Sequence, residues 1–303
     1  MHRDVTVFGS ANADLRVLVD KPPTPGQSAV GHDLEMGPGG KGLNQAVAAS
    51  RMGARTTFVG AVGTDDHAAI LLRCLDESGV EACVDEVEGR ATGAALIALD
   101  AEGQITVIEL PGANGTLDVL SDRAAHVVAH TAVLLLQLET PVPGSAAAAA
   151  AARRAGATVV LNAAPHASAA EPFLADVDVL VTDAEEAAEL TGLAEAGPEE
   201  LAAALATRVP AAIVFGGLRG SVLADRDGVR GLPRYVAHAL DSSAVNDTFC
   251  GALAAGLARG EALEAAATRA VAAAALAVQR PGSADSIPTL EDVDAYMELG
   301  RAG

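Results

Sequence analysis

The chain has 303 residues, 50% of them hydrophobic, and a formal net charge of −20. This length suffices for one large α/β core, and the negative charge argues against a surface that binds nucleic acids or anionic membranes. Cys74, Cys83 and Cys250 lack metal-ligand spacing and suggest a reducing compartment rather than a disulfide framework. We find no signal peptide and no apolar stretch that must span a bilayer, so a cytoplasmic protein is expected.

The N-terminal region predicts short strands ahead of the first helix. Residues 4–9 form an apolar run, residues 15–19 alternate in polarity, and residues 28–36 read as a further strand. Strands that precede any helix indicate a small sheet that projects from the main body. A helix is expected next, over 43–52.

From residue 55 onward, predicted strands and helices mostly alternate. The expected strands are 56–61, 82–87, 93–99, 104–109, 132–138, 157–161, 178–181 and 211–215. The expected helices are 66–78, 142–155, 184–191, 198–207, 247–258 and 261–279. This order is typical of a mainly parallel sheet covered by helices on both faces. We therefore expect one α/β domain over 1–303, with a β lid formed by about 14–36 and 82–109.

A glycine-rich segment, Gly37-Pro38-Gly39-Gly40-Lys41-Gly42, opens the first helix. It fits the G-x-G-x-x-G spacing of dinucleotide-binding folds, in which the glycines join the first strand to the first helix. Here the segment follows later strands, and the nearest acids, Asp65 and Asp66, lie past another turn. The sequence contains no G-x-x-x-x-G-K-[ST] phosphate loop either. Dinucleotide binding is therefore not the favoured interpretation.

The segment Asp241 to Gly251 leads from small polar residues into an alanine-rich helix. The first turn of a helix has free N–H groups and a partial positive charge, so it attracts phosphate. Asp247 at this position is either a helix cap or a base held beside a bound phosphate. Taken alone, the segment favours the cap.

Polar or glycine residues follow several predicted strands at their carboxyl ends. In open parallel sheets, ligands bind beyond these ends. The positions are Asn12, Asp14, Glu139, Asn162, Asp183 and Gly216. We expect them to converge on one cleft.

Several motifs in this order resemble the ribokinase (PfkB) family of sugar kinases. They are Gly9-Ser10-Ala11-Asn12-Ala13-Asp14, Gly39-Gly40-Lys41-Gly42-Leu43-Asn44-Gln45-Ala46, Gln137-Leu138-Glu139-Thr140-Pro141, Leu190-Thr191-Gly192 and Asp247-Thr248-Phe249. The resemblance covers nearly the whole chain. It implies a ribokinase-like α/β fold with a β lid, and ATP-dependent phosphorylation of a free sugar, with D-ribose at O5 favoured. The alternatives are a PfkB kinase for another sugar or a nucleoside, and a degenerate homologue that binds sugar without transferring phosphate. An aromatic content of only 2% argues against a nucleoside.

The resemblance assigns roles to individual residues. The sugar pocket would be lined by Asn12, Asp14, Gly39, Gly40, Lys41, Asn44, Glu139 and Asp247. Asp247 would be the general base, and the N–H groups of Ala244, Val245, Asn246 and Asp247 would hold the charge of the transferring phosphoryl group. Considered singly, Asn12 and Asp14 also fit a turn, Glu139 a solvated strand end, and Lys41 a surface lysine.

The nucleotide and its ions are assigned in the same way. ATP would lie against Asp183, Gly216, Gly217, Gly220 and Asn246. Glu186 would bind Mg²⁺ through water, although Asp183 and Glu186 also fit an acidic first turn of a helix. A monovalent cation, K⁺, would be bound by Asp241, Ser286 and the backbone carbonyls near Ser243, Arg280 and Gly282. The implied partners are sugar, ATP and a second copy in a homodimer, with no nucleic acid and no membrane.

The sequence departs from the family pattern at three places. Val245-Asn246 stands where the family usually has alanine and glycine, Asp183 replaces the usual asparagine, and Ala163 replaces the usual proline. Asn246 tolerates a left-handed backbone, but its side chain is bulkier than a glycine beside the phosphate. These changes bear on turnover and nucleotide geometry more than on the fold.

Overall fold

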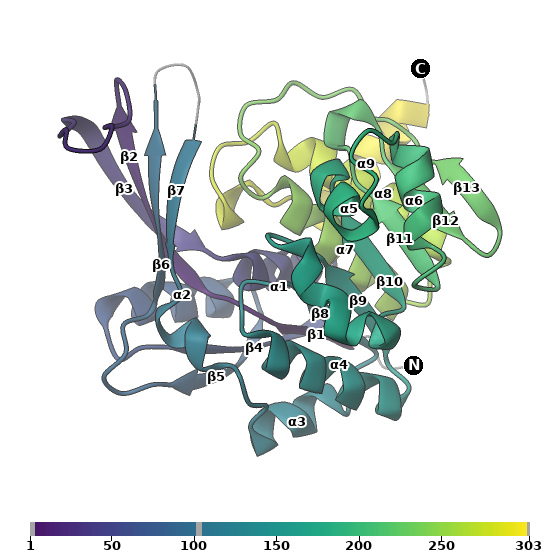
Figure 1. Ribbon diagram of the computed structural model, residues 1–303, viewed down its shortest axis with the longest axis horizontal. Helices are drawn as coiled ribbons and strands as arrows, with labels where there is room; N and C mark the ends of the chain where they lie inside the picture. Colours follow the sequence, from purple (N-terminus) through teal and green to yellow (C-terminus); the bar gives the residue numbers. More distant parts are fainter. Residues whose placement is uncertain (1–3, 101–104, 302–303) are drawn as a thin grey trace.

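The computed structural model describes residues 4–100 and 105–301 and has a large sheet flanked by helices, with a smaller sheet projecting from one side (Figure 1). The large sheet has nine strands in the order β13-β12-β11-β10-β9-β8-β1-β4-β5. Its strands are β1 (Asp4–Phe8), β4 (Arg55–Val62), β5 (Glu81–Glu86), β8 (Val133–Leu136), β9 (Thr158–Asn162), β10 (Val179–Thr182), β11 (Ala211–Val214), β12 (Val222–Asp225) and β13 (Gly228–Gly231). All neighbours pair in parallel from β5 to β11, whereas β12 and β13 add an antiparallel edge.

Helices cover both faces of this sheet. They are α1 (Lys41–Arg51), α2 (Asp66–Glu77), α3 (Asp122–Val128), α4 (Val142–Ala155), α5 (Ala184–Thr191), α6 (Pro198–Leu205), α7 (Val245–Ala258), α8 (Leu263–Ala277) and α9 (Leu290–Arg301). Short 3₁₀ helices lie at Gly112–Thr116, Ala167–Asp176, Gly217–Arg219 and Ala284–Ser286.

The core is divided into two layers by the sheet. One layer contains α1, α2, α7, α8 and α9, and the other contains α3, α4, α5 and α6. Successive strand residues point to opposite layers, as the two-residue period of a strand requires: Val7 packs in the first layer and Phe8 in the second. The predicted α/β architecture with both faces covered is therefore confirmed.

The smaller sheet, here called the lid sheet, consists of β3 (Gly31–Gly39), β2 (Asn12–Val19), β6 (Gly93–Leu99) and β7 (Ile105–Leu110), in that order. β2 pairs in parallel with β6, and the outer pairs are antiparallel. The sequence prediction also placed 82–87 in this sheet. Instead, β5 pairs with β4 at the edge of the large sheet, because the α2 crossover returns the chain there.

Several predicted boundaries agree with the structure. The helices expected at 142–155 and 184–191 coincide with α4 and α5, and the strand expected at 93–99 coincides with β6. The strand expected at 104–109 is found as β7, although residue 104 lies outside the described residues. The sequence did not predict α3, α9 or the β12–β13 hairpin. Within 4–100 and 105–301, no helix is both long and apolar enough to cross a membrane.

Candidate active site

Asp247 lies in the first turn of α7, where that helix packs tightly against α1. Gly251, one turn later, permits this approach, because a Cβ atom there would come within 2.5 Å of the Gln45 carbonyl oxygen. The packing places the Asp247 carboxylate over two amides of α1. Asn44 Nδ2 donates to Asp247 Oδ2 (3.1 Å), and Gln45 Nε2 donates to Oδ1 (3.0 Å).

The environment of Asp247 favours a proton acceptor that works near neutral pH. Its side chain is 4% exposed. Burial raises its pKa to about 6, although the charge of Lys41 and the hydrogen bonds from Gln45 and Asn44 oppose the rise. The side chain does not cap α7, because the N-cap residue is Ala244 and it makes no side-chain hydrogen bond. The helix-cap interpretation of Asp247 therefore does not hold.

The start of α7 keeps N–H groups free for a ligand. The helix ladder begins with Thr248 N, which donates to Ala244 O, so the N–H groups of Asn246 and Asp247 have no acceptor among the described residues. No described residue other than glycine has a positive φ, so Asn246 needs no left-handed backbone here. Its Oδ1 accepts a weak hydrogen bond from Cys250 Sγ at 3.7 Å, which holds the side chain along the next helical turn.

A cavity of about 200 Å³, here called the central cavity, lies between the lid sheet and the start of α7. Its lining combines lid residues with residues of the body: Asn12, Asp14, Arg16, Gly40, Lys41, Asn44, Ala95, Ile97, Val107, Glu109, Glu139, Ser243, Asp247 and Ser283. The structure thus brings Asn12, Asp14, Asn44, Glu139 and Asp247 around one space. The predicted single cleft is only partly found, because the lining does not include Gly39, Asn162, Asp183 or Gly216.

Asp14 lies on the face of β2 that looks into the central cavity. The residue is 8% exposed, and its Oδ2 accepts a hydrogen bond from Ser283 Oγ (3.1 Å). Burial raises the pKa of Asp14 to about 6, although that hydrogen bond and the charges of Arg16 and Lys41 act in the opposite direction. Above this pH, Asp14 offers a partly desolvated carboxylate to hydroxyl donors.

Glu139 and Lys41 form the base of the cavity. Glu139 Oε2 accepts from Ser10 Oγ and from Lys41 N (3.0 Å), and Lys41 Nζ lies 3.9 Å from Glu139 Oε1. Glu139 is thus fixed by protein donors rather than free at a strand end. Burial alone would lower the pKa of Lys41, but the carboxylates of Asp247 and Glu139 outweigh it and raise that pKa. Lys41 is therefore a fixed positive charge between two carboxylates.

Gly40 lets the backbone turn into α1 directly against β2. Its φ is +90°, and a Cβ atom there would lie 2.8 Å from Asn12 N. A side chain at this position would be strained and would also push β2 away. Gly39, the last residue of β3, pairs with Asn12 on β2.

The sequence analysis gave no role to four residues of the site. Arg16, Glu109 and Ser283 line the cavity, and Gln45 donates to Asp247. Gln45 could have been found from its place beside Asn44 in the same motif. Its Oε1 accepts from Gln137 Nε2 (2.9 Å), which turns its Nε2 toward Asp247. The other three lie on the lid or in a distant loop, and local sequence carries no signal that brings them to Asp14.

A second cavity, of about 260 Å³ and here called the apolar cavity, lies on the other side of the 242–247 segment. It is lined by Phe215, Gly216, Gly217, Arg219, Arg234, Tyr235, Ala239, Ser242, Val245, Val271, Ala274, Ala275 and Val278. Of the residues predicted to contact the nucleotide, Gly216 and Gly217 are in this lining, whereas Gly220, Asp183 and Asn246 are not. An apolar space of this kind suits a flat aromatic base.

Asp183 and Glu186 form a capping box at the start of α5. Glu186 N donates to Asp183 Oδ1, and Asp183 N donates to Glu186 Oε2, both at 2.8 Å. The predicted helix-start role is therefore realised. Burial raises the pKa of Glu186 to about 7, against the backbone hydrogen bond from Asp183. No group of three or more His, Cys, Asp or Glu side chains within the described chain forms a metal site.

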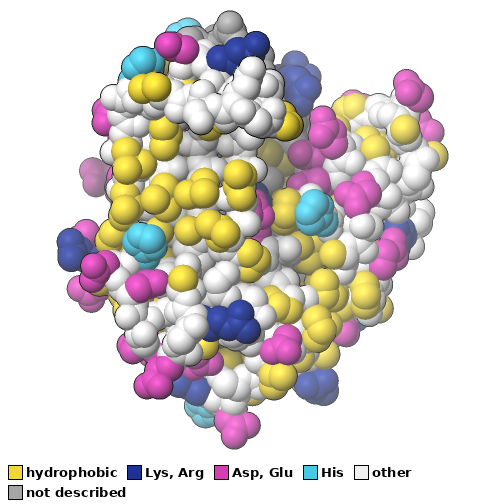
Figure 2. Space-filling view, turned by 60° about the vertical axis from the view of Figure 1, so that its left-hand side comes forward, with side chains coloured by type: hydrophobic (Ala, Val, Ile, Leu, Met, Phe, Trp, Pro, Cys, Tyr) yellow, Lys and Arg dark blue, Asp and Glu magenta, His cyan; other side chains and the backbone are white. Residues whose placement is uncertain are grey.

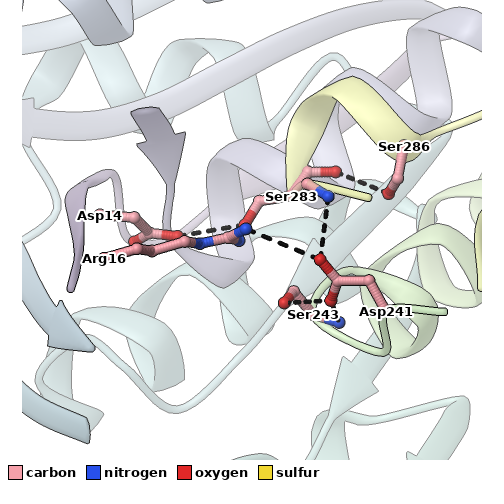
Figure 3. A network of polar contacts seen from close by, with 7 residues as sticks. Asp14, Arg16, Asp241, Ser243, Ser283 and Ser286 are labelled. Carbon is pink, nitrogen blue, oxygen red and sulfur yellow. Dashed lines mark hydrogen bonds and ion pairs between the residues drawn. The ribbon is translucent and has the colours of Figure 1, made fainter. Parts of the chain in front are cut away.

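The two side chains predicted to bind a monovalent cation, Asp241 and Ser286, already have protein partners. Ser243 and Gly282 both donate to the carboxylate of Asp241, and Ser286 Oγ donates to the carbonyl of Ser283 (Figure 3). The predicted contribution of Arg280 is its backbone carbonyl, and its side chain pairs with Asp292 (3.3 Å).

Comparisons with known proteins agree with this geometry. A family model described as "pfkB family carbohydrate kinase" matches residues 2–290. The chain belongs to the pfkB family of carbohydrate kinases. It is therefore a sugar kinase, an enzyme that transfers a phosphoryl group to an alcohol and whose fold is ribokinase-like.

Individual relatives are similar to this chain over nearly its whole length. Ribokinase of Haemophilus influenzae is 30% identical, covering 98% of this chain and 99% of its own. Deoxyribokinase of Salmonella typhi is 29% identical, covering 98% of this chain and 100% of its own. The structure of Arabidopsis thaliana ribokinase complexed with ribose and ATP matches with a TM-score of 0.89 and 29% identity, covering 98% of this chain and 99% of that one.

Proposed function

We propose that this kinase phosphorylates D-ribose at O5 with ATP, and that Asp247 is the general base. The observation that carries the proposal is that the buried carboxylate of Asp247 opens onto the same cavity as Asn12 and Asp14. Ribose binding by the Arabidopsis relative, together with the ribokinases of similar sequence, supports the choice of sugar. We further propose that the sugar fills the central cavity and that the nucleotide base fills the apolar cavity.

The lining of the central cavity supports a small neutral sugar. Its volume of about 200 Å³ lies below the range of roughly 300–1,000 Å³ that is usual for drug-sized ligands. The polar lining residues match the hydroxyls of a sugar, whereas Ala95, Ile97 and Val107 provide an apolar wall. No aromatic side chain among the described residues lines this cavity, so a nucleoside would have no stacking surface for its base there. The aromatic rings of Phe215 and Tyr235 lie in the apolar cavity instead.

The geometry supports a direct displacement mechanism. Asp247 accepts the proton of the ribose O5 hydroxyl as O5 forms a bond to the γ-phosphorus, and the bond from that phosphorus to the bridging oxygen of ADP breaks. The free N–H groups of Asn246 and Asp247, at the positive end of α7, stabilise the charge on the transferring group. Lys41 adds a positive charge next to Asp247 and Glu139.

The donor set near α5 fits a hydrated Mg²⁺ bound mainly through nucleotide phosphates. Mg²⁺ keeps several waters and takes few protein carboxylates. Glu186 offers such a carboxylate, and the buried side chains of Asn162 and Thr182 have no partner within the described chain. When bound, the ion would neutralise the β- and γ-phosphates. We propose these residues, with Asp183, as its surroundings.

A substrate panel tests the proposed sugar. A coupled assay that measures ADP release is expected to show turnover with D-ribose. With 2-deoxyribose, kcat/KM should be at least about tenfold lower, because each lost hydrogen bond to a charged group removes about 1.5–3 kcal/mol. Nucleosides should give no release. Faster turnover of 2-deoxyribose, or of any nucleoside, would contradict the assignment of ribose while leaving the kinase family intact.

We also propose that the kinase is a homodimer joined through the outer face of the lid sheet. Exposed side chains form a cross-strand row on the face opposite Asp14, and Figure 2 shows hydrophobic side chains gathered over this part of the surface. The row contains Met36, Leu96 and Ile108. Leu15 on β2 pairs with Met36 on β3 and with Leu96 on β6, and Leu96 pairs with Ile108 on β7. Apolar surface of this kind on a sheet favours a covering partner.

Light scattering after gel filtration tests the dimer. The native chain is expected at twice the mass of one chain, and Ile108→Glu at the mass of one. Val119→Glu, which changes an exposed residue outside the lid sheet, is the matched control and should remain a dimer. A native monomer would contradict the proposal.

A further inference from the structure

The carboxylate of Asp241 has protein donors on both oxygens. Oδ1 accepts from Ser243 N (2.8 Å) and from Ser243 Oγ, and Oδ2 accepts from Gly282 N (2.9 Å). The remaining interaction of Oδ2 is an ion pair with Arg16 Nη1 at 3.6 Å. Figure 3 shows the guanidinium reaching across from β2 to this carboxylate. Three of the roughly four acceptor positions of the carboxylate therefore hold hydrogen bonds, and the guanidinium lies beside the fourth.

Arg16 itself is held between the lid sheet and the segment that leads into α7. It lies two residues after Asp14 on β2, so both side chains point to the same face of the sheet. Its Nη2 donates to Ser283 Oγ, which in turn donates to Asp14 Oδ2 (3.1 Å). The side chains of Arg16 and Asp241 are only 22% and 21% exposed, so the pair is largely removed from solvent.

These contacts do not fit a monovalent cation bound by Asp241. Such an ion needs several oxygens directed at one point. The carboxylate of Asp241 already accepts three hydrogen bonds, Ser286 Oγ is turned toward the carbonyl of Ser283, and a guanidinium already supplies the positive charge. The backbone carbonyls near Ser243, Arg280 and Gly282 would then be the remaining oxygens for such an ion. A second cation would have to displace the ion pair or share the space with a like charge.

We infer that Arg16 is a tethered cation that takes the place of K⁺ in this kinase. It neutralises Asp241 six residues before Asp247 and links that segment to the lid residue Asp14. Arg16 is thus a positioning residue for the free N–H groups at the start of α7. The inference rests on the kinase activity of the family and not on the identity of the sugar.

The test compares K⁺ with choline at equal ionic strength. For the native kinase, kcat and the melting temperature should be the same in both salts. Arg16→Met removes the charge but keeps an unbranched side chain, so kcat in choline should fall by about tenfold or more, as expected for loss of a charge-assisted contact. K⁺ should then restore most of the lost rate and raise the melting temperature of this variant.

Two further variants separate a tethered charge from a structural role. Arg16→Lys keeps a positive charge and should remain indifferent to K⁺. Arg55→Met removes another ion-paired arginine, bound to Asp4 away from both cavities, and should behave like the native kinase. A native kinase whose rate or melting temperature depends on K⁺ would overturn the inference, as would an Arg16→Met variant that K⁺ neither rescues nor stabilises. The melting temperatures are measured without sugar, so they test the inference even if the substrate assignment is incorrect. The comparison of the two salts on the native kinase does not depend on the folding of any variant.

Discussion

Replacing Asp247 by asparagine is expected to reduce kcat by about 10²- to 10⁴-fold, the range for loss of a general base. Asparagine keeps the shape of the side chain but cannot take the proton of the attacking hydroxyl. The affinity for ribose should change little, because Asn12 and Asp14 on the lid side of the cavity remain. Coupled ADP release gives kcat, and calorimetric titration with ribose gives the affinity.

The matched control is Asp122→Asn, an exposed aspartate in the first turn of α3. It makes the same chemical change in the first turn of another helix and should leave kcat unaltered. If Asp247→Asn turned over at the native rate, another group would have to be the base. If it lost ribose binding instead, Asp247 would be a binding residue rather than a base.

The same residue sets the expected pH dependence. Because burial raises the pKa of Asp247 to about 6, the carboxylate is ionised above this pH and protonated below it. A base must be ionised to accept a proton, so kcat/KM, which reports the free enzyme, should be level above about pH 6 and fall as the pH drops through it. The profile of kcat/KM also includes Asp14, whose pKa is raised to about 6 as well, so the two groups titrate together in that quantity.

Replacing Asp14 by asparagine is expected to raise KM for ribose by about 10- to 150-fold, with a much smaller change in kcat. Hydrogen bonds to a charged acceptor contribute about 1.5–3 kcal/mol, which corresponds to this range. The neutral amide would lose that charge, and its NH₂ group would face the donating Ser283 Oγ. Initial rates over a range of ribose concentrations separate KM from kcat.

Asp33→Asn provides the control for this substitution. Asp33 is an exposed aspartate on β3 of the same lid sheet, and its Oδ1 only accepts from Leu34 N. Its KM should match that of the native kinase. A fall in kcat with unchanged KM in Asp14→Asn would mean that Asp14 acts on the transition state rather than on sugar binding.

Much of the fold was predictable because local signals mark the elements. The helix at 184–191 is bounded by a capping aspartate, Asp183, and by Gly192 in a left-handed conformation, and both signals are readable in sequence. Sheet membership was less predictable. Nothing within 82–87 says that β5 pairs with β4 and not with the lid, because that choice depends on the path of α2.

The residues of the candidate site also differ in how well the sequence predicted them. Motif residues such as Asn44 and Asp247 were placed correctly in one cavity, since each follows a strand or opens a helix at the same edge of the sheet. Arg16 was missed because its partner Asp241 is distant in sequence and meets it only when the lid sheet covers the body. The concern over Asn246 was the bulk of its side chain beside the phosphate. In the structure its Oδ1 accepts a weak hydrogen bond from Cys250 Sγ (3.7 Å), and its backbone φ is not positive.

A crystal structure with ribose and a non-hydrolysable ATP analogue would test the arrangement most directly. We expect ribose O5 within hydrogen-bond distance, about 2.6–3.2 Å, of the Asp247 carboxylate, with secondary hydroxyls on Asp14 and the γ-phosphate before the first turn of α7. A sugar bound outside the central cavity, or with O5 turned away from Asp247, would contradict the proposed chemistry.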